Sequence, residues 1–246
     1  MRAAELLQKI MNSQDSVDEV EAVRERYSRR SMSHDPLRYS LLNLSVLLSQ
    51  QERQRALVEW VTRCGIHPVG SKRVLEVGCG NGSNLLDLMR LGFAPENLVG
   101  NELLPQRNHE ARRLLPAAVT VLEGDATRLD LQTDSFDVVM QSTVFSSLLD
   151  DEFQATLAEC MWRWVRPGGG VLWYDFVHDN PSNADVRGVP MGRVRELFPV
   201  GRVWQRRLTL APPIARRVTS AHPWLYGLFN SMPVLRTHRL CWIQKP

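Results

Sequence analysis

The sequence predicts an α/β protein built on one mostly parallel sheet with helices on both faces. Short apolar segments alternate with amphipathic segments across residues 73–176. Alternation of this kind is typical of strand–helix–strand units, which build parallel sheets. A glycine-rich segment, residues 76–82, directly follows the first apolar segment. Because crossovers are right-handed, the carboxyl ends of all parallel strands meet at one edge, where ligands bind.

Length and composition favour a single globular domain with additional segments. The chain has 246 residues, of which 43% are hydrophobic, enough to bury a sizeable core. Its net charge of +3 is too small to indicate nucleic-acid binding. The four cysteines stand far apart and form no metal-binding or disulfide pattern, so we expect no metal and a cytoplasmic location. Residues 1–10, which include Glu5 and Lys9, do not predict a secretory leader, and no apolar run is long enough to predict a membrane span.

The first 70 residues predict a helical extension, which we expect to act as a lid over the domain formed by residues 71–246. Residues 12–30 predict a polar helix, and Pro36 ends it. Apolar side chains recur at helical spacing over residues 52–64, and Gly65 is a typical helix stop. A packed pair of helices without a lid function is an equal alternative.

The central region predicts five strands and three helices in alternation. Each expected strand is a short apolar segment bounded by glycine, proline or polar residues. Residues 166–170, which read Arg-Pro-Gly-Gly-Gly, predict a sharp turn before the fifth strand. The expected strands are 73–77, 98–100, 119–123, 135–141 and 171–176, and the expected helices are 84–91, 105–115 and 151–165.

The last third of the chain predicts two more strands separated by an apolar insertion. A polar loop over residues 178–190 precedes a short helix near residues 192–198. The two late strands are expected at residues 203–210 and 238–243. Between them, residues 211–235 are rich in proline and aromatic side chains. We expect this insertion to pack over the sheet edge; lining an acceptor pocket or touching a membrane surface are the alternatives.

The glycine-rich segment is the strongest local indication of a ligand site. Gly78, Gly80 and Gly82 follow a strand and precede a helix, so the backbone can approach a ligand closely. Their G-x-G-x-G spacing differs from the G-x-G-x-x-G of dinucleotide-binding loops. An acid, Glu76, stands two residues before the first glycine and favours a ligand that carries an ammonium group. The alternative is a tight strand-to-helix turn without a ligand.

Two further acids follow the next two strands. Glu102 lies about 20 residues beyond the glycine segment, where a carboxylate can accept hydrogen bonds from both ribose hydroxyls. Asp125 follows the third strand and could bind an adenine amino group, with the Ala126 amide on a ring nitrogen. A solvated loop acid is the alternative for Glu102.

These segments, followed by Phe-Asp-Val-Val at residues 136–139 and Arg-Pro-Gly-Gly at residues 166–169, resemble class I S-adenosylmethionine-dependent methyltransferases over residues 73–176. Asn101 departs from the family, which usually has an apolar residue there. The resemblance implies a Rossmann-like fold with seven strands, the last antiparallel. It implies S-adenosylmethionine as methyl donor and S-adenosylhomocysteine as product, with Gln141 facing the methyl group. The donor set is then Glu76, Gly78, Cys79, Gly80, Glu102, Leu103, Asp125, Ala126 and Gln141.

Methyl transfer in this family is a displacement at an already activated methyl group. A general base is needed only if the acceptor is a hydroxyl or a protonated amine. His178 is the candidate base because its usual pKa suits proton abstraction, although a loop histidine without such a role is an equal interpretation. The predicted catalytic set is His178, Tyr174 and Gln141, and the predicted acceptor-binding set is Tyr39, Phe145, Arg187 and Arg193. The arginines could hold an anionic acceptor or form a solvated basic face.

The acceptor itself is less well indicated. Segments such as residues 38–43 and 141–149 resemble bacterial methyltransferases of surface-polysaccharide and lipopolysaccharide synthesis, which implies a small-molecule or glycan acceptor. One alternative is a lipophilic acceptor such as a quinone, and another is an inactive donor-binding partner protein. A nicotinamide oxidoreductase is disfavoured by the glycine spacing and by the lack of a Tyr-x-x-x-Lys pair. We expect no nucleic-acid partner, and peripheral membrane contact would involve residues 211–235.

Overall fold

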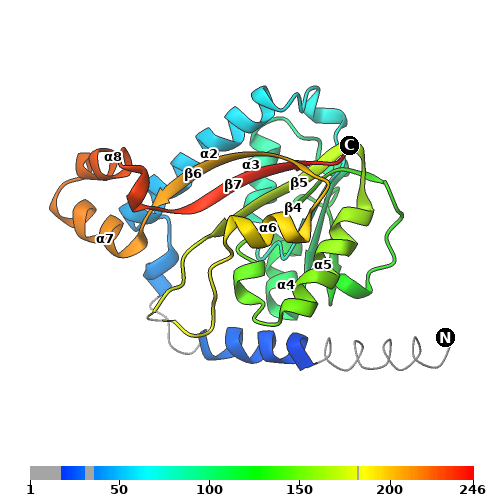
Figure 1. The fold of residues 1–246 in the computed structure, drawn as a ribbon, viewed down its shortest axis with the longest axis horizontal. Helices are drawn as coiled ribbons and strands as arrows, with labels where there is room; N and C mark the ends of the chain where they lie inside the picture. The colour runs from blue at the N-terminus through cyan, green and yellow to red at the C-terminus, as the bar shows by residue number, and fades with distance from the viewer. Residues whose placement is uncertain (1–17, 31–35, 182) are drawn as a thin grey trace.

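A computed structural model describes residues 18–30, 36–181 and 183–246 (Figure 1). Its centre is a seven-stranded sheet with the order β3-β2-β1-β4-β5-β7-β6. The first five strands are parallel, and β7 runs antiparallel to both neighbours, as the sequence predicts. The strands are β1 (Val74–Val77), β2 (Leu98–Glu102), β3 (Thr120–Glu123), β4 (Phe136–Ser142), β5 (Val165–Phe176), β6 (Arg202–Leu210) and β7 (Arg236–Gln244).

Helices cover both faces of this sheet. The first described helix comprises residues 18–30; the predicted residues 12–17 of this helix lie outside the described part of the chain. The others are α2 (Leu44–Arg63), α3 (Ser83–Arg90), α4 (Pro105–Leu114), α5 (Asp151–Trp164), α6 (Met191–Leu197), α7 (Pro212–Ala221) and α8 (Trp224–Asn230). Short 3-10 turns occur at Pro36–Tyr39, Val69–Ser71, Pro95–Asn97, Ala126–Arg128, Phe145–Ser147 and Pro233–Leu235.

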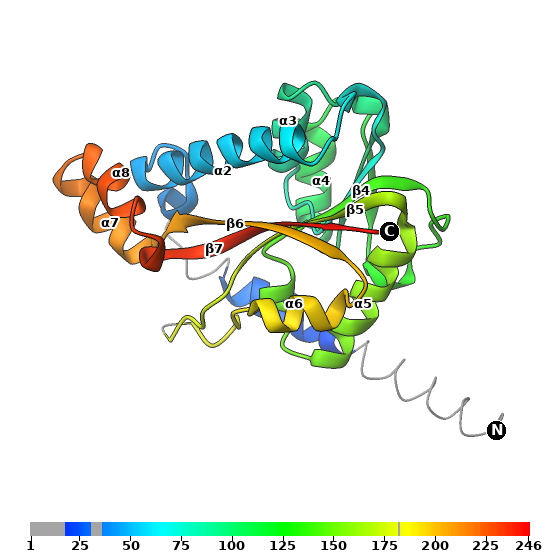
Figure 2. The same ribbon diagram turned by 45° about the horizontal axis from the view of Figure 1, so that its top comes forward.

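The two sheet faces bury separate apolar cores. One core packs α2, α3 and α4 on the sheet, and the other packs α5, α6 and the helix of residues 18–30 (Figure 2). Strands β1 and β4 are buried along nearly their whole length, which explains their continuous apolar sequences. Burial of this apolar surface is the dominant stabilising contribution to such a fold.

Helix α2 belongs to the core, although it lies within the segment expected to form a lid. Asn43 caps the helix by accepting a hydrogen bond from the Ser45 amide at 3.1 Å, so the helix begins earlier than apolar spacing predicts. Trp60 is fully buried and stacks on Phe93, with ring centroids 6.3 Å apart. Only the helix of residues 18–30 remains as a described candidate lid.

The predicted turn at residues 166–170 lies inside β5. Phe136 pairs with Val165 and Val138 pairs with Gly170, so β5 bulges against β4 at this point. A Cβ atom at Gly169 would stand 2.5 Å from the Asp137 carbonyl oxygen. The glycines thus permit a close strand contact rather than a chain reversal.

Residues 211–235 form α7, α8 and a 3-10 turn, which pack together against the start of α2. Leu210, Ala215 and Tyr226 form a small core with Leu48 of α2 beside it. Because these residues connect the end of β6 to the start of β7, they lie at the sheet edge where β5 ends (Figure 1). No described helix is long and apolar enough to cross a membrane.

Candidate functional site

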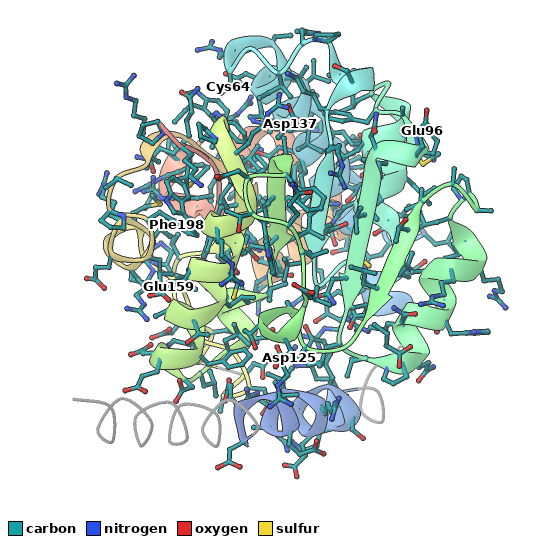
Figure 3. All side chains as sticks on the ribbon, turned by 90° about the vertical axis from the view of Figure 1, so that its right-hand side faces the viewer. Cys64, Glu96, Asp125, Asp137, Glu159 and Phe198 are labelled. Atoms are coloured by element: carbon teal, nitrogen blue, oxygen red, sulfur yellow. The ribbon has the colours of Figure 1, made fainter. Side chains whose placement is uncertain are left out.

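A cavity of about 430 Å³ opens where the parallel strands end. The ends of β1, β2 and β4 and the loop after β3 form its floor, and the helix of residues 18–30 covers it (Figures 1 and 3). This volume lies within the range of small-molecule sites. Its lining includes Val20, Val23, Tyr27, Arg53, Val77, Gly78, Cys79, Gly80, Asn84, Asn101, Glu102, Leu103, Asp125, Ala126, Ser142, Thr143, Val144, Leu148, Phe153 and Leu157.

The glycine-rich loop after β1 brings bare backbone to the cavity. Gly78 has φ of +67°, and a Cβ atom there would stand 2.5 Å from Cγ2 of Val144. Gly80 has φ of +57°, and a Cβ atom there would have no neighbour within 4 Å. The left-handed conformation therefore favours glycine at both positions. At Gly80 the backbone faces open space, so a ligand can lie directly against it.

Glu102 is fixed at the end of β2 by two backbone amides. Its Oε2 accepts a hydrogen bond from the Gly80 amide at 2.8 Å, and its Oε1 accepts one from the Leu104 amide at 2.9 Å. The side chain is nearly buried yet lines the cavity. A carboxylate has about four acceptor positions, so two remain for a pair of ligand hydroxyls.

Asn101, the departure from the family pattern, has a structural role beside Glu102. Its Nδ2 donates to the Gly124 carbonyl oxygen at 3.0 Å, which ties the loop after β3 to the end of β2. The position of Asp125 at the cavity therefore depends in part on this amide.

Glu76 lies one layer below the cavity and is fully buried. Its Oε1 accepts a hydrogen bond from Nδ2 of Asn84, a residue that lines the cavity. Its Oε2 has no hydrogen-bond partner among the described residues. Burial raises the pKa of Glu76 to about 7, against the opposing effects of Asn84 and Arg53. A cationic group at this end of the cavity would compensate the buried carboxylate, so the site fits an ammonium-bearing ligand.

Asp125 and Ala126 line the cavity on the β3 side, and Figure 3 shows Asp125 at the sheet edge nearest the helix of residues 18–30. The Asp125 carboxylate accepts hydrogen bonds from the amide and hydroxyl of Thr127, each at 2.9 Å. Arg128 lies 3.4 Å from the same carboxylate. The side chain is thus oriented by its own turn, with acceptor positions left for a ligand.

The helix of residues 18–30 is anchored over the cavity by a buried ion pair. Arg26 lies 2.7 Å from Glu19 and donates to the Ser147 carbonyl oxygen at 3.1 Å. Glu19 also accepts a hydrogen bond from the Leu149 amide at 2.8 Å. The apolar face of the helix places Val20, Val23 and Tyr27 against the cavity.

Arg53 is a cavity residue that no sequence motif indicates. It projects from α2, with Nη1 3.4 Å from Oγ of Ser142 at the end of β4. Its guanidinium group lies 5.5 Å from the centre of the Tyr174 ring and 3.8 Å from the Asp87 carboxylate. Only the approach of α2 to the sheet places this cation beside the end of β4.

Several residues predicted to act in catalysis or to bind the acceptor lie away from the cavity lining. The Tyr174 hydroxyl forms a hydrogen bond of 2.7 Å with Oγ1 of Thr209, and His178 is exposed in the loop after β5. Phe145 is fully buried against Trp173, with ring centroids 4.4 Å apart. Tyr39 is exposed before α2. Gln141 is buried one layer below the cavity, where its Oε1 accepts a hydrogen bond from the Val144 amide at 2.9 Å.

The two predicted acceptor-binding arginines meet at the start of α5. Arg187 forms an ion pair with the Asp151 carboxylate, and Arg193 donates to the Asp151 carbonyl oxygen at 2.6 Å. Arg193 also donates to Oε1 of Gln154 at 3.2 Å. Neither arginine lines the cavity, and both have partners within the protein. In the described part of the chain, no three His, Cys, Asp or Glu side chains are grouped to hold a metal ion.

Comparisons with known proteins agree on the fold of this region. A family described as a methyltransferase domain matches residues 74–169. The phthiotriol/phenolphthiotriol dimycocerosates methyltransferase 1 of Mycobacterium ulcerans (strain Agy99) is 35% identical over 140 residues, which are 52% of this chain and 47% of that protein. The fatty-acid O-methyltransferase of Mycolicibacterium smegmatis (strain ATCC 700084 / mc(2)155) is 39% identical over 108 residues, which are 44% of this chain and 38% of that protein.

A solved structure resembles the chain over nearly its whole length. Phosphoethanolamine N-methyltransferase 1 of Haemonchus contortus, in complex with phosphoethanolamine and S-adenosylhomocysteine, has a TM-score of 0.60 at 12% identity. The likeness covers 93% of this chain and 49% of that chain, and at this identity it concerns the fold alone. The matched part of the chain spans less than half the length of each of the two sequence relatives described above.

Proposed function

We propose that this chain, which contains a class I S-adenosylmethionine-dependent methyltransferase domain, transfers a methyl group from S-adenosylmethionine to an oxygen atom of a lipophilic acceptor. The observation that carries the proposal is the arrangement of the glycine loop, Glu102 and Asp125 around one cavity at the strand ends. These residues offer bare backbone and two oriented carboxylates where three parallel strands end.

The ammonium group, ribose and adenine of S-adenosylmethionine would bind in different regions of this cavity. Glu76 would compensate the donor's ammonium group, because its buried Oε2 has no partner among the described residues. Glu102 would accept hydrogen bonds from the ribose hydroxyls, and Asp125 with Ala126 would bind adenine. The helix of residues 18–30 would cover the bound donor and exclude water. When bound, S-adenosylmethionine supplies an activated methyl group, so the protein's main tasks are alignment and desolvation.

A lipophilic acceptor is favoured by the names of the relatives and by the cavity lining. The two relatives described above are named for lipid substrates, and one is named an O-methyltransferase. Leu148, Phe153 and Leu157 give part of the lining an apolar character. No relative described above is named for a glycan, so a glycan acceptor rests on the flanking segments alone.

Arg53 favours an acceptor that is already anionic, such as a carboxylate. Among the described lining residues there is no histidine, and the side chains at the end of β4 are the neutral hydroxyls of Ser142 and Thr143. A carboxylate acceptor needs no general base, since its oxygen is already deprotonated near neutral pH. The Arg53 guanidinium can hold such a group through paired hydrogen bonds.

Calorimetric titration followed by methyl transfer tests the proposal. Purified protein is titrated with S-adenosylmethionine, S-adenosylhomocysteine and NAD, and then assayed with labelled donor and a long-chain fatty acid, a phenolic lipid or a sugar phosphate. We expect micromolar binding of the first two ligands only, and transfer to the fatty acid. The Glu102→Ala variant should bind donor at least about tenfold more weakly, because it loses hydrogen bonds to a charged group.

Glu123→Ala is the matched control, because Glu123 pairs with Glu102 in the sheet register but is exposed. This variant should bind donor as the wild type does. A folded protein that binds neither ligand would overturn the donor assignment. Donor binding with transfer only to the sugar phosphate would overturn the lipophilic acceptor.

A further inference from the structure

We propose that α7, α8 and the neighbouring residues 39–42 form a surface that docks on an anionic lipid bilayer. We call this set of residues, 39–42 and 212–234, the hairpin surface. The proposal goes beyond methyl transfer, because docking concerns how the whole protein is placed and does not require a particular acceptor.

Helix α8 is apolar on both its inward and its outward faces, and the outward face has no cover among the described residues. Tyr226 and Phe229 pack inward, and the Tyr226 hydroxyl forms a hydrogen bond of 3.1 Å with Oγ of Ser49 on α2. Trp224 and Leu228, one helical turn apart, are 59% and 49% exposed. A tryptophan and a leucine on one outward face are typical of helices that lie in a membrane interface.

The apolar outer face continues beyond α8 on both sides. Val234 in the following turn is 79% exposed, and Met232 is also exposed. Residues 39–42, just before α2, lie beside the α7–α8 pair in both Figure 1 and Figure 2. In this segment Leu41 is 57% and Leu42 is 87% exposed. Clustered exposure of large apolar side chains indicates an interaction site.

The charge of this part of the chain identifies the partner as anionic. Residues 197–246 contain eight Arg and Lys residues and no Asp or Glu. Two of the eight, Arg216 and Arg217, belong to the hairpin surface, whereas Arg206 and Lys245 form ion pairs with Glu59 and Asp134. Since the whole chain has 30 basic and 27 acidic residues, the first 196 residues have 22 basic against 27 acidic ones. Arg216 and Arg217 on α7 form no ion pair with any described residue. Basic groups beside interfacial aromatic and aliphatic side chains match the surface of an anionic bilayer.

The hairpin surface lies at the sheet edge that a membrane-docked enzyme would turn toward the bilayer. Phe176 at the end of β5 pairs with His238, and Leu210 at the end of β6 pairs with Arg236. The α7–α8 pair therefore emerges from the same sheet edge on which the cavity opens. Docking through this surface would bring the open edge of the sheet toward the bilayer.

Vesicle binding tests the proposal without any acceptor or methyl transfer. The full chain is sedimented with vesicles of phosphatidylcholine alone and with equimolar phosphatidylcholine and phosphatidylglycerol, at low and high salt. We expect binding to the anionic vesicles that weakens at high salt. Trp224→Ser with Leu228→Ser should weaken binding more than about tenfold, since both apolar anchors are lost. Arg216→Glu and Arg217→Glu should each weaken it at least about fivefold.

Two variants on α4 serve as matched controls. The exposed fraction of Leu114, 50%, is nearly the same as that of Leu228, 49%. Arg113, the preceding residue on α4, is also exposed. Leu114→Ser and Arg113→Glu should bind vesicles as the wild type does, and unchanged melting temperatures would show that every variant is folded. Equal binding by the hairpin and α4 variants would overturn the proposal. The proposal would also be overturned if the protein bound no vesicles and instead formed a dimer that the Leu228→Ser substitution dissociates. The hairpin surface would then be a contact between two copies of the chain.

Discussion

Arg53 is the cation beside the end of β4, and its surroundings limit what it can bind. Its guanidinium group donates hydrogen bonds to Gln50 at 2.8 Å and to Ser142 at 3.4 Å, and it lies 3.8 Å from the Asp87 carboxylate. Its Nε has no hydrogen-bond partner among the described residues. An arginine with unused donors at a cavity can bind a carboxylate through two parallel hydrogen bonds. Both S-adenosylmethionine and a fatty-acid acceptor carry a carboxylate that Arg53 could bind. An experiment must therefore measure the effect of Arg53 on donor binding and on acceptor binding separately.

We expect Arg53→Met to raise the KM for a carboxylate acceptor about tenfold or more, while the Kd for S-adenosylmethionine changes less than about twofold. Methionine preserves the apolar length of the side chain and removes the charge. Steady-state kinetics with the acceptor and calorimetry with the donor measure the two effects separately. Weakened donor binding with an unchanged acceptor KM would instead assign Arg53 to the donor's carboxylate.

The residues that we propose to bind the donor can be located from sequence, because they are tied to local backbone signals. Gly78 and Gly80 stand between a strand and a helix, and Glu102 and Asp125 follow the next two strands. Arg53, Val20 and Tyr27 reach the cavity only through long-range packing, so no spacing in the chain indicates them. The same reason applies to Phe145 and Tyr174, whose aromatic side chains serve packing rather than the cavity lining.

The helix of residues 18–30 is the element that closes the cavity, and polar contacts anchor it at both ends, including an ion pair of 2.8 Å between Arg29 and Asp185. The Glu19–Arg26 pair and the Glu19 bond to the Leu149 amide connect it to the loop after β4. Arg107 of α4 lies 4.6 Å from the centre of the Tyr27 ring on the same helix. A single helix at the surface of the fold can open more readily than the sheet that it covers.

We expect Glu19→Gln to speed the dissociation of S-adenosylhomocysteine by about tenfold or more. Removing one charge leaves Arg26 buried and unpaired, which costs about 3 kcal/mol of docking free energy in comparable buried pairs. Stopped-flow displacement measures the rate. Glu21→Gln is the control, because Glu21 pairs with Arg24 at 3.2 Å on the exposed face and such pairs contribute little. Equal rates for both variants would show that the ion pair does not hold the helix closed.

At the level of elements, the sequence predicts the sheet more accurately than its surroundings. Apart from the amino end of β5, the strands and α3 to α5 agree with prediction within a few residues, since each is an apolar or amphipathic segment bounded by glycine, proline or polar residues. The course of α2 differs, because its first turns are fixed by the Asn43 cap and by contact with Tyr226, which lies far along the chain. The bulge in β5 likewise depends on the Asp137 carbonyl of the neighbouring strand.

For the molecule as a whole, the amino and carboxyl ends of the strands differ in how far buried carboxylates are compensated by basic side chains. At the amino end of β4, Asp137 is compensated by Arg166 and by Lys72 at 3.5 Å, and Figure 3 shows it at the opposite end of the sheet from Asp125. At the carboxyl ends, Glu76 and Asp175 are fully buried, and burial raises the pKa of each to about 7. Buried carboxylates with raised pKa values therefore lie at the sheet edge where we propose that the donor binds, as is common for functional sites.

This arrangement predicts opposite pH effects on the free protein and on its complex. Because the pKa of Glu76 rises from 4.5 to about 7 on folding, the folded protein holds a proton that the unfolded chain has released in this interval. The free energy of unfolding should therefore fall as pH rises from about 4.5 to about 7, by on the order of 3 kcal/mol from Glu76. The ammonium group of S-adenosylhomocysteine favours the ionised carboxylate, so the stabilisation by this ligand should grow over the same interval.

Denaturant unfolding of the wild type and Glu76→Gln, each with and without S-adenosylhomocysteine, measures both effects. The wild type should lose stability relative to Glu76→Gln between about pH 4.5 and about pH 7, because only the wild type must ionise a buried carboxyl group. The stabilisation by ligand should rise with pH in the wild type and stay level in the variant. Parallel pH profiles for the two proteins without ligand would mean that Glu76 ionises as readily in the folded protein as in the unfolded chain. In that case a cation other than the donor's ammonium group would have to compensate its charge.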